Sequence, residues 1–199
     1  SALIEFVHHI TCALDAKLFS ITLFLDLTKA FDCLDHSILI NKLNRYGIRG
    51  TLLSWFDSYL SSRKQFIYYN NVQSNMKTIN CGVPQGSILG PLLFLLFIDD
   101  IRKISQNMNF ILFADDTTVT ISHHDINQLN ETANNEFKKI HKWLHSNKLI
   151  CNASKTHLMI FSNRKYNPDV IKIYFAGIEI KQVSNSKFLG VVVDDRLTW

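Results

Sequence analysis

Apolar residues recur along this chain with two different periods, which predict a mixture of helices and strands. Near the start, five apolar residues repeat at helical spacing and predict an amphipathic helix. These residues are Leu3, Phe6, Val7, Ile10 and Leu14. Further helices are expected where similar patterns continue, at residues 37–46, 52–60, 89–104 and 126–144.

Strand patterns fall between these helices. Residues 18–25 form a dense apolar run, fit for a strand covered on both faces. Asn70-Asn71, a pair that tolerates positive φ, predicts a hairpin between residues 65–69 and 72–79. Helices interleaved with hairpins indicate an α+β fold, an antiparallel sheet packed on helices, rather than a doubly wound parallel sheet. The remaining strands are expected at 157–161, 171–175, 178–183 and 188–193, with a tight turn at Ala176-Gly177.

Two adjacent acids interrupt the most strand-like stretch of the chain. Residues 110–121 are rich in β-branched and aromatic residues, and Asp115 and Asp116 stand where the two flanking runs must reverse. A hairpin with both acids at or beside its tip is therefore expected. A solvated turn would explain a lone acidic pair. A second acidic strand end, Asp26 after the run 18–25, favours a functional interpretation.

The composition narrows the class of protein. A length of 199 residues suits one domain or one and a half, and 47% hydrophobic with 19% charged residues excludes disorder as the main state. A net charge of +4 permits a nucleic-acid partner without establishing one. The four cysteines show neither a zinc spacing nor a disulfide framework, so a reducing, intracellular compartment is expected. The longest apolar run, 92–98, is too short to span a bilayer, so no membrane partner is expected.

The three carboxylates raise an electrostatic problem that metal ions would solve. Burial at a strand end raises the pKa of a carboxyl group, and a neighbouring like charge raises it further. Hard oxygen ligands favour Mg²⁺, whose coordination is completed by substrate phosphates. Two such ions about 3.5–4 Å apart would activate a hydroxyl nucleophile and stabilise the leaving oxygen in phosphoryl transfer. This hypothesis requires the strands that carry Asp26 and Asp115 to pair.

Three ordered motifs resemble the palm motifs of reverse transcriptases. They are FLDLTKAFD at 24–32, GVPQGSILGPLLF at 82–94 and FADD at 113–116. The resemblance is strongest to enzymes of non-LTR (LINE-type) retrotransposons, particularly the jockey and CR1-like kind, and extends over nearly the whole chain. It implies the palm of a right-hand polymerase and an RNA-directed DNA polymerase. The expected partners are an RNA template, a DNA primer or target, and deoxynucleoside triphosphates.

The resemblance also implies roles for individual residues near the metal. Asp26 and Asp115 would be the principal ligands of two Mg²⁺ ions, or of Mn²⁺ as a substitute. Asp116 would be the accessory acid, and the carbonyl of Leu27 would complete the site. Lys155 would lie near the triphosphate and could protonate the leaving pyrophosphate.

Two further groups of residues match nucleotide and primer contacts. Phe31 falls where the family places a steric gate against a ribose 2′-hydroxyl, although core packing is the ordinary role of such a residue. The loop that contacts the nucleotide and template would be Pro84, Gln85 and Gly86. Lys187 to Val191 resembles the primer-grip hairpin, with contacts expected from Phe188, Leu189 and Gly190.

The resemblance leads to an expected domain plan. Residues 1–185 would be the palm, with a partial fingers-side insert at 36–80, and residues 186–199 would be the primer-grip hairpin leading to a missing thumb. The fingers are expected to be largely missing as well. The alternative is a catalytically inert fragment or domesticated nucleic-acid-binding remnant of this fold. An RNA-copying RNA polymerase is disfavoured by Phe31. Copying at the target site implies the nucleus.

Overall fold

The chain forms two compact units. The structure is a computed structural model and describes residues 2–198. Of the described residues, the first unit contains 2–28, 101–145 and 150–198. The second unit contains Lys29–Asp100 with Ser146–Leu149. No helix in the described part of the chain is both long and apolar enough to cross a membrane.

A five-stranded sheet forms the centre of the first unit. Its strand order is β11-β8-β1-β7-β6, and every pairing except the parallel β11–β8 pair is antiparallel. The apolar run near residue 20 forms the central strand, and all seven of its residues are buried, as predicted for a strand covered on both faces. The strands are β1 (Phe19–Leu25), β6 (Asn109–Phe113), β7 (Asp116–His123), β8 (His157–Phe161) and β11 (Lys181–Gln182).

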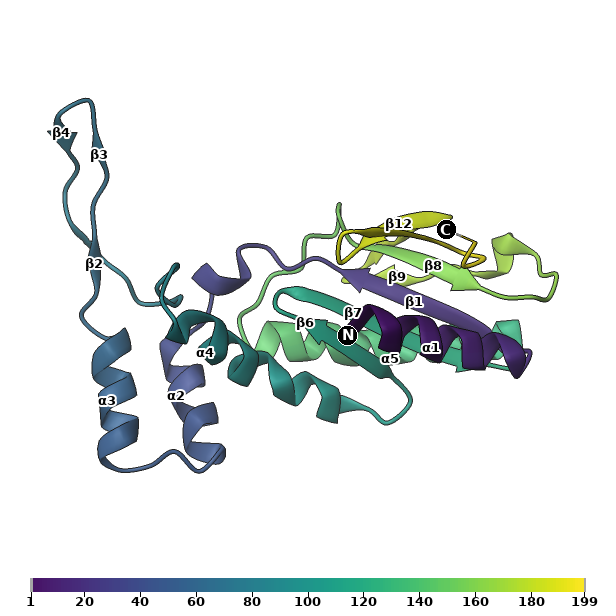
Figure 1. Cartoon of the computed structure of the whole chain (residues 1–199), viewed down its shortest axis with the longest axis horizontal. Coiled ribbons are helices and arrows are strands. Elements are labelled where there is room, and N and C mark those ends of the chain that lie inside the picture. Colours follow the sequence, from purple (N-terminus) through teal and green to yellow (C-terminus); the bar gives the residue numbers. More distant parts are fainter. Residues whose placement is uncertain (1, 199) are drawn as a thin grey trace. The chain divides into compact units, whose positions relative to one another are not determined.

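Helices cover this sheet. Figure 1 shows α1 (Ala2–Asp15) in front of the sheet and α5 (Ile126–Ser146) behind it. Phe6 and Ile10 of α1 are fully buried in a cluster with residues of the sheet and of the C-terminal hairpin. The other members of this cluster are Phe24, Ile111, Met159, Phe161, Phe188 and Val193. Both helices were predicted from apolar spacing, and both are confirmed.

The C-terminal part of the first unit is built from short strands and tight turns. Ala176 (φ 53°) and Gly177 (φ 80°) form the predicted turn of one hairpin. The expected strand at 188–193 is wrong, because the chain reverses at Leu189 (φ 49°) and Gly190 (φ 88°) and forms a second hairpin. The elements are η3 (Pro168–Val170), β9 (Tyr174–Phe175), β10 (Ile178–Glu179), β12 (Asn185–Phe188) and β13 (Val191–Asp194).

The second unit consists of helices and a two-stranded ribbon. Its helices are η1 (Ala30–Asp32), α2 (His36–Arg45), α3 (Thr51–Leu60) and α4 (Leu89–Ile98). The ribbon contains β2 (Lys64–Gln65), β3 (Tyr68–Tyr69), β4 (Val72–Gln73) and β5 (Lys77–Thr78). Asn70 (φ 47°) and Asn71 (φ 59°) form its tip in the left-handed conformation, which confirms the predicted hairpin.

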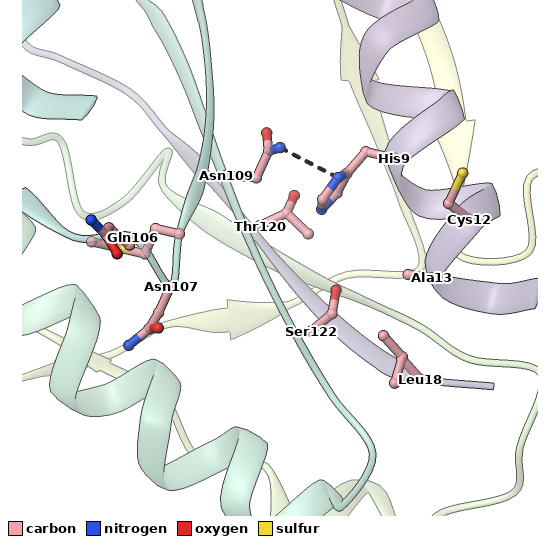
Figure 2. Close-up of a pocket in the computed structure, with 10 residues that line it drawn as sticks. His9, Cys12, Ala13, Leu18, Gln106, Asn107, Asn109, Thr120 and Ser122 are labelled. Atoms are coloured by element: carbon pink, nitrogen blue, oxygen red, sulfur yellow. Dashed lines mark hydrogen bonds between the residues drawn. The ribbon is translucent and has the colours of Figure 1, made fainter. Parts of the chain in front are cut away.

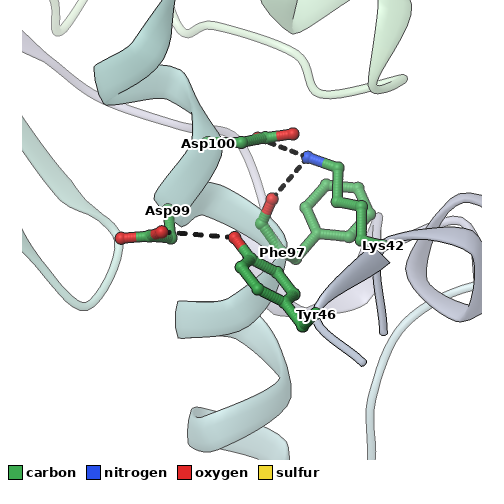
Figure 3. Close-up of polar contacts among 5 residues, drawn as sticks. All are labelled: Lys42, Tyr46, Phe97, Asp99 and Asp100. Atoms are coloured by element: carbon green, nitrogen blue, oxygen red, sulfur yellow. Dashed lines mark hydrogen bonds and ion pairs between the residues drawn. The ribbon is translucent and has the colours of Figure 1, made fainter. Parts of the chain in front are cut away.

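The helix expected at 89–104 is interrupted. The α-helix ends at Ile98 and continues as the 3₁₀ segment η2 (Asp99–Ile104). At this point the Lys42 ammonium donates to the Phe97 carbonyl and pairs with Asp100, both at 2.6 Å (Figure 3). Tyr46 donates to Asp99 at 3.2 Å. Lys42 of α2 and Tyr46, the residue after α2, thus bind the last turn of α4 and the first acids of η2, where the helix tightens.

Candidate active site

The predicted acids lie at one edge of the central sheet. The last residue pair between the antiparallel strands β1 and β7 is Leu25 with Thr117. Asp26 comes directly after Leu25 and Asp116 directly before Thr117, so both acids lie just beyond this pair, at the same end of the two strands. Asp115 precedes Asp116 in the turn between β6 and β7, which Ala114 closes with a φ of 50°. The strand pairing that the metal hypothesis requires is therefore present.

The charges of the three acids interact. Partial loss of hydration beside the sheet raises the pKa of Asp116, and the negative charges of Asp115 and then Asp26 raise it further. Asp26 is half-buried, whereas Asp115 and Asp116 are exposed. An edge that disfavours a further negative charge in this way is suited to a cation.

Backbone hydrogen bonds fix the chain beyond β1. The Asn152 amide donates to the Asp26 carbonyl, and the Thr28 amide donates to the Ile150 carbonyl, both at 2.8 Å. Leu27 and Cys151 form an antiparallel bridge between these two bonds. In such a pair each residue directs its own amide and carbonyl away from the other. The Leu27 carbonyl is therefore directed away from residues 150–152, the side of β1 on which β8 lies.

A pocket of about 140 Å³ lies at this edge of the sheet. Asp26, Asp116, Lys155 and Phe188 all line it. The structure thus brings together two predicted metal ligands, the predicted proton donor and one predicted primer contact. Leu189 and Gly190 form the turn of the β12–β13 hairpin that begins at Phe188.

His157 is a residue of this pocket that the sequence did not single out. Its Nδ1 lies 2.9 Å from the Lys155 carbonyl, its Nε2 lies 2.6 Å from the Ser186 hydroxyl, and its ring stacks on Phe24 at 5.2 Å. It therefore links β8 to the β12–β13 hairpin. Its Ser186 partner is 29 residues away, so no local spacing could have indicated the contact.

The predicted nucleotide contacts lie in the second unit. Phe31 is half-buried, and its ring packs against Phe94 with 4.7 Å between centroids. The amide of Gln85 donates to Asp32 at 2.7 Å, and Gly86 has a φ of 78°, which favours glycine.

Close backbone packing joins the two loops that carry these contacts. The Val83 amide donates to the Phe31 carbonyl at 2.9 Å. A Cβ on Gly82 would lie 2.7 Å from the Asp32 carbonyl oxygen, and one on Gly90 would lie 2.8 Å from that of Pro84. The structure therefore groups Phe31, Pro84, Gln85 and Gly86 within the second unit.

A larger pocket of about 440 Å³ lies against α1 in the first unit (Figure 2). The Asn109 amide lies 3.3 Å from His9 Nδ1, and burial lowers the pKa of His9. The polar residues along its floor are neutral, and Thr120 and Ser122 bond to hydroxyls of β1. Among the described residues that line this pocket there is no acid and no predicted site residue.

The donors at the acidic edge suit a hard divalent ion. Carboxylate and carbonyl oxygens are the ligands that Mg²⁺ prefers. However, no three side chains of the acidic, histidine or cysteine type are gathered into a ready metal cluster within residues 2–198. Asp26, Asp115 and Asp116 share an edge without converging on one point, as mutual repulsion favours. Their roles as metal ligands stay a prediction.

Comparison with known proteins decides the family. The family model described as reverse transcriptase (RNA-dependent DNA polymerase) matches residues 3–193. The chain belongs to the reverse transcriptase family. Reverse transcriptases generally use divalent metal ions, which agrees with the oxygen donors at this edge.

Its curated relatives include polymerases of insect retrotransposons. The chain is 29% identical to the probable RNA-directed DNA polymerase from transposon BS of Drosophila melanogaster, over 98% of this chain and 23% of that protein. It is 27% identical to the RNA-directed DNA polymerase from mobile element jockey of the same species, over 94% of this chain and 21% of that protein. The chain thus spans about a quarter or less of the length of these relatives.

Solved structures confirm the fold. Apo telomerase from Candida tropicalis, truncated from its C-terminal domain, matches with a TM-score of 0.64 at 12% identity, over 98% of this chain and 38% of that one. Telomerase from Candida albicans, in complex with a fragment of telomeric RNA, matches with a TM-score of 0.57 at 16% identity, over 89% of this chain and 32% of that one. At this identity the likeness establishes the right-hand polymerase fold alone.

Proposed function

We propose that this chain is the catalytic core of an RNA-directed DNA polymerase of the non-LTR retrotransposon type. The reaction would transfer a deoxynucleotide to a primer 3′-hydroxyl opposite an RNA template, at the target DNA in the nucleus. The observation that carries the proposal is the register of β1 and β7, which delivers Asp26, Asp115 and Asp116 to one edge of the sheet.

The metal ligands in this proposal are the oxygens of the acidic edge. Asp26, Asp115 and Asp116, with the Leu27 carbonyl, would hold two Mg²⁺ ions, or Mn²⁺ in their place. When bound, these ions would supply Lewis-acid activation of the primer hydroxyl and neutralise charge on the phosphates. The raised pKa of Asp116 and the direction of the Leu27 carbonyl both support this assignment.

The remaining residues would bind and orient the substrates. Lys155 would hold a proton for the leaving pyrophosphate, and its position in the same pocket as Asp26 supports this role. Phe188 with its hairpin turn would seat the primer end. Phe31 would exclude the ribose 2′-hydroxyl, and Gln85 would contact the nucleotide, with its amide already oriented by Asp32.

Primer extension on an RNA template with Mg²⁺ tests this function. We expect wild-type protein to extend the primer and Asp115→Asn to lose extension. Asp57→Asn, a change at an exposed acid on α3, is the matched control and should keep full activity. Wild-type protein that binds primer and template without extending them would support the inert remnant instead. Extension that survives in Asp115→Asn would refute the metal assignment.

A further inference from the structure

The ribbon of the second unit exposes all of its side chains. Every residue from Lys64 to Thr78, which we call the hairpin arm, is solvent-exposed. In Figure 1 the arm extends beyond α2 and α3 of its own unit. Such a ribbon is marginal alone, and exposed apolar side chains in a group mark a binding surface. Six large apolar residues of the arm are between 47% and 73% exposed: Phe66, Ile67, Tyr68, Tyr69, Val72 and Met76.

The arm is positively charged. Lys64 and Lys77 lie within it, Arg63 lies at its base, and the sequence contains no aspartate or glutamate between Asp57 and Asp99. Cations attract phosphates, and aromatic rings stack on unpaired bases. A surface that combines both and lacks acids therefore complements single-stranded nucleic acid. An acidic protein would match the charge alone, whereas unpaired nucleic acid matches both the cations and the exposed tyrosine rings.

A pocket continues from the base of the arm toward the nucleotide loop. Its volume is about 470 Å³, and Arg63 and Gln65 line it together with Lys29 and Gln85. Gln65 lies opposite Lys77 across the ribbon, so their side chains share one face. Arg63 donates to the Gly82 carbonyl at 3.3 Å, which ties the base of the arm to the loop of Gln85. Lys29 and Arg63 thus place two cations, beside the single acid Asp32, between the loop of Gln85 and the base of the arm within one unit.

We propose that the hairpin arm binds the unpaired template RNA strand. The RNA strand would wrap around the ribbon, because neighbouring side chains of a β-strand point to opposite faces. Tyr68 and Tyr69, one on each face, would stack on its bases, and Lys64 and Lys77, also on opposite faces, would hold its phosphates. The identity of the strand as template rests on the proposed polymerase function, whereas the chemistry of the surface selects single-stranded nucleic acid. Duplex RNA is a poor ligand because its bases are already stacked on one another.

Fluorescence anisotropy with labelled single-stranded RNA tests the proposal. The measurement uses the full chain with the Asp115→Asn substitution and no nucleotide, so that no synthesis contributes. We expect Tyr68→Ala/Tyr69→Ala to weaken binding by at least about 30-fold, because each of the two stacked bases contributes about 1–3 kcal/mol. The paired Tyr→Phe double variant keeps both rings and should bind as well as the parent.

The charge contribution is measured separately. Lys64→Ala/Lys77→Ala should lower the slope of log affinity against log salt by about 1.4, since each phosphate contact on a single strand contributes about 0.7. Tyr174→Ala and Lys172→Ala change exposed residues of the first unit and should leave RNA binding unchanged. Circular dichroism melting verifies that every variant is folded.

The outcomes separate this proposal from the polymerase proposal. Unchanged RNA affinity in both arm variants would overturn the arm proposal, even if primer extension is normal. If the arm variants lose self-association in sedimentation but keep RNA binding, the arm proposal is also overturned, and the arm is assigned to a protein contact. Arm-dependent RNA binding without any primer extension by the wild-type chain would leave the arm proposal standing and remove the polymerase function alone.

Discussion

The acidic edge of the sheet and the hairpin arm differ in almost every physical respect. Asp26 follows a strand that is buried along its whole length, whereas every residue of the arm is exposed. The edge gathers three negative charges, whereas the arm has only positive ones. Catalysis requires groups that are held in place, and a buried strand supplies such rigidity. Binding an RNA strand whose sequence changes requires only contacts that accept any base, and an exposed aromatic and basic ribbon can supply them.

The largest expected effect separates the two regions by activity. Asp26→Asn should lower the rate of primer extension by about 10²–10³-fold or more, because it removes a charge that is needed only during phosphoryl transfer. The same substitution should leave single-stranded RNA binding by the arm within about twofold of wild type. Measuring the extension rate and the RNA affinity on one preparation shows whether the acidic edge and the arm act independently. Parallel losses in both would show that the two regions are not independent.

Stability should differ between the regions by a smaller but clear amount. Leu23→Ala, in the fully buried strand β1, should reduce the free energy of unfolding by about 2–5 kcal/mol through loss of burial and a cavity. Ile67→Ala, at a side chain of the arm that is 73% exposed, should change it by less than about 0.5 kcal/mol. Urea denaturation followed by circular dichroism measures both. A large loss for Ile67→Ala would mean that the arm is packed in solution.

Nucleotide selection tests a third group, in the second unit. Phe31→Ala should relax discrimination against ribonucleotides by about 10- to 10²-fold, the range in which an apolar wall rejects one added hydroxyl. Single-nucleotide insertion with matched deoxy and ribo substrates measures this ratio. If the ratio is unchanged, the contact with Phe94 is the whole role of the Phe31 ring, and it packs without selecting the sugar.

The smallest effect concerns pH. The pKa of Asp116 lies above its ordinary value of 3.8, so the folded chain binds this proton more tightly than the unfolded chain does. The contribution of Asp116 to the free energy of unfolding should therefore fall as pH rises through the window just above 3.8, and the deficit should persist at higher pH. Asp116→Asn should remove this fall when unfolding is measured without divalent metal. Identical pH profiles for the variant and the wild type would contradict the charge interaction among the acids.

Local patterns were sufficient to predict most of the fold. The apolar spacing of α1 and α5, the buried run of β1 and the Asn70-Asn71 turn are properties of adjacent residues, and each prediction is confirmed. The errors arose where distant contacts decide the conformation. The helix after Leu89 changes at Ile98, where Lys42 from α2 binds its end. The last expected strand folds back at Leu189, and Phe188 beside this turn packs on Phe6 from the opposite end of the chain.

The candidate site was predictable to a similar extent. Asp26 and Asp116 could be placed at one edge because strand ends are visible in the sequence and the resemblance ordered the motifs. His157 could not be predicted, because its role depends on Ser186 and Phe24, which only the folded chain brings to it. The raised pKa of Asp116 also could not be predicted, because the contribution of Asp26 depends on the register of β1 and β7, which no single motif determines.

Direct measurement of Mn²⁺ binding by electron paramagnetic resonance tests the central claim, that acids from two paired strands hold the same divalent ions. Titrations of wild-type protein, Asp26→Asn, Asp115→Asn and the double variant need no substrate. We predict that each single variant loses most of the binding and that the double variant loses little more, because the ligands act on shared ions. Full binding in either single variant, or losses that add independently in the double variant, would contradict the claim.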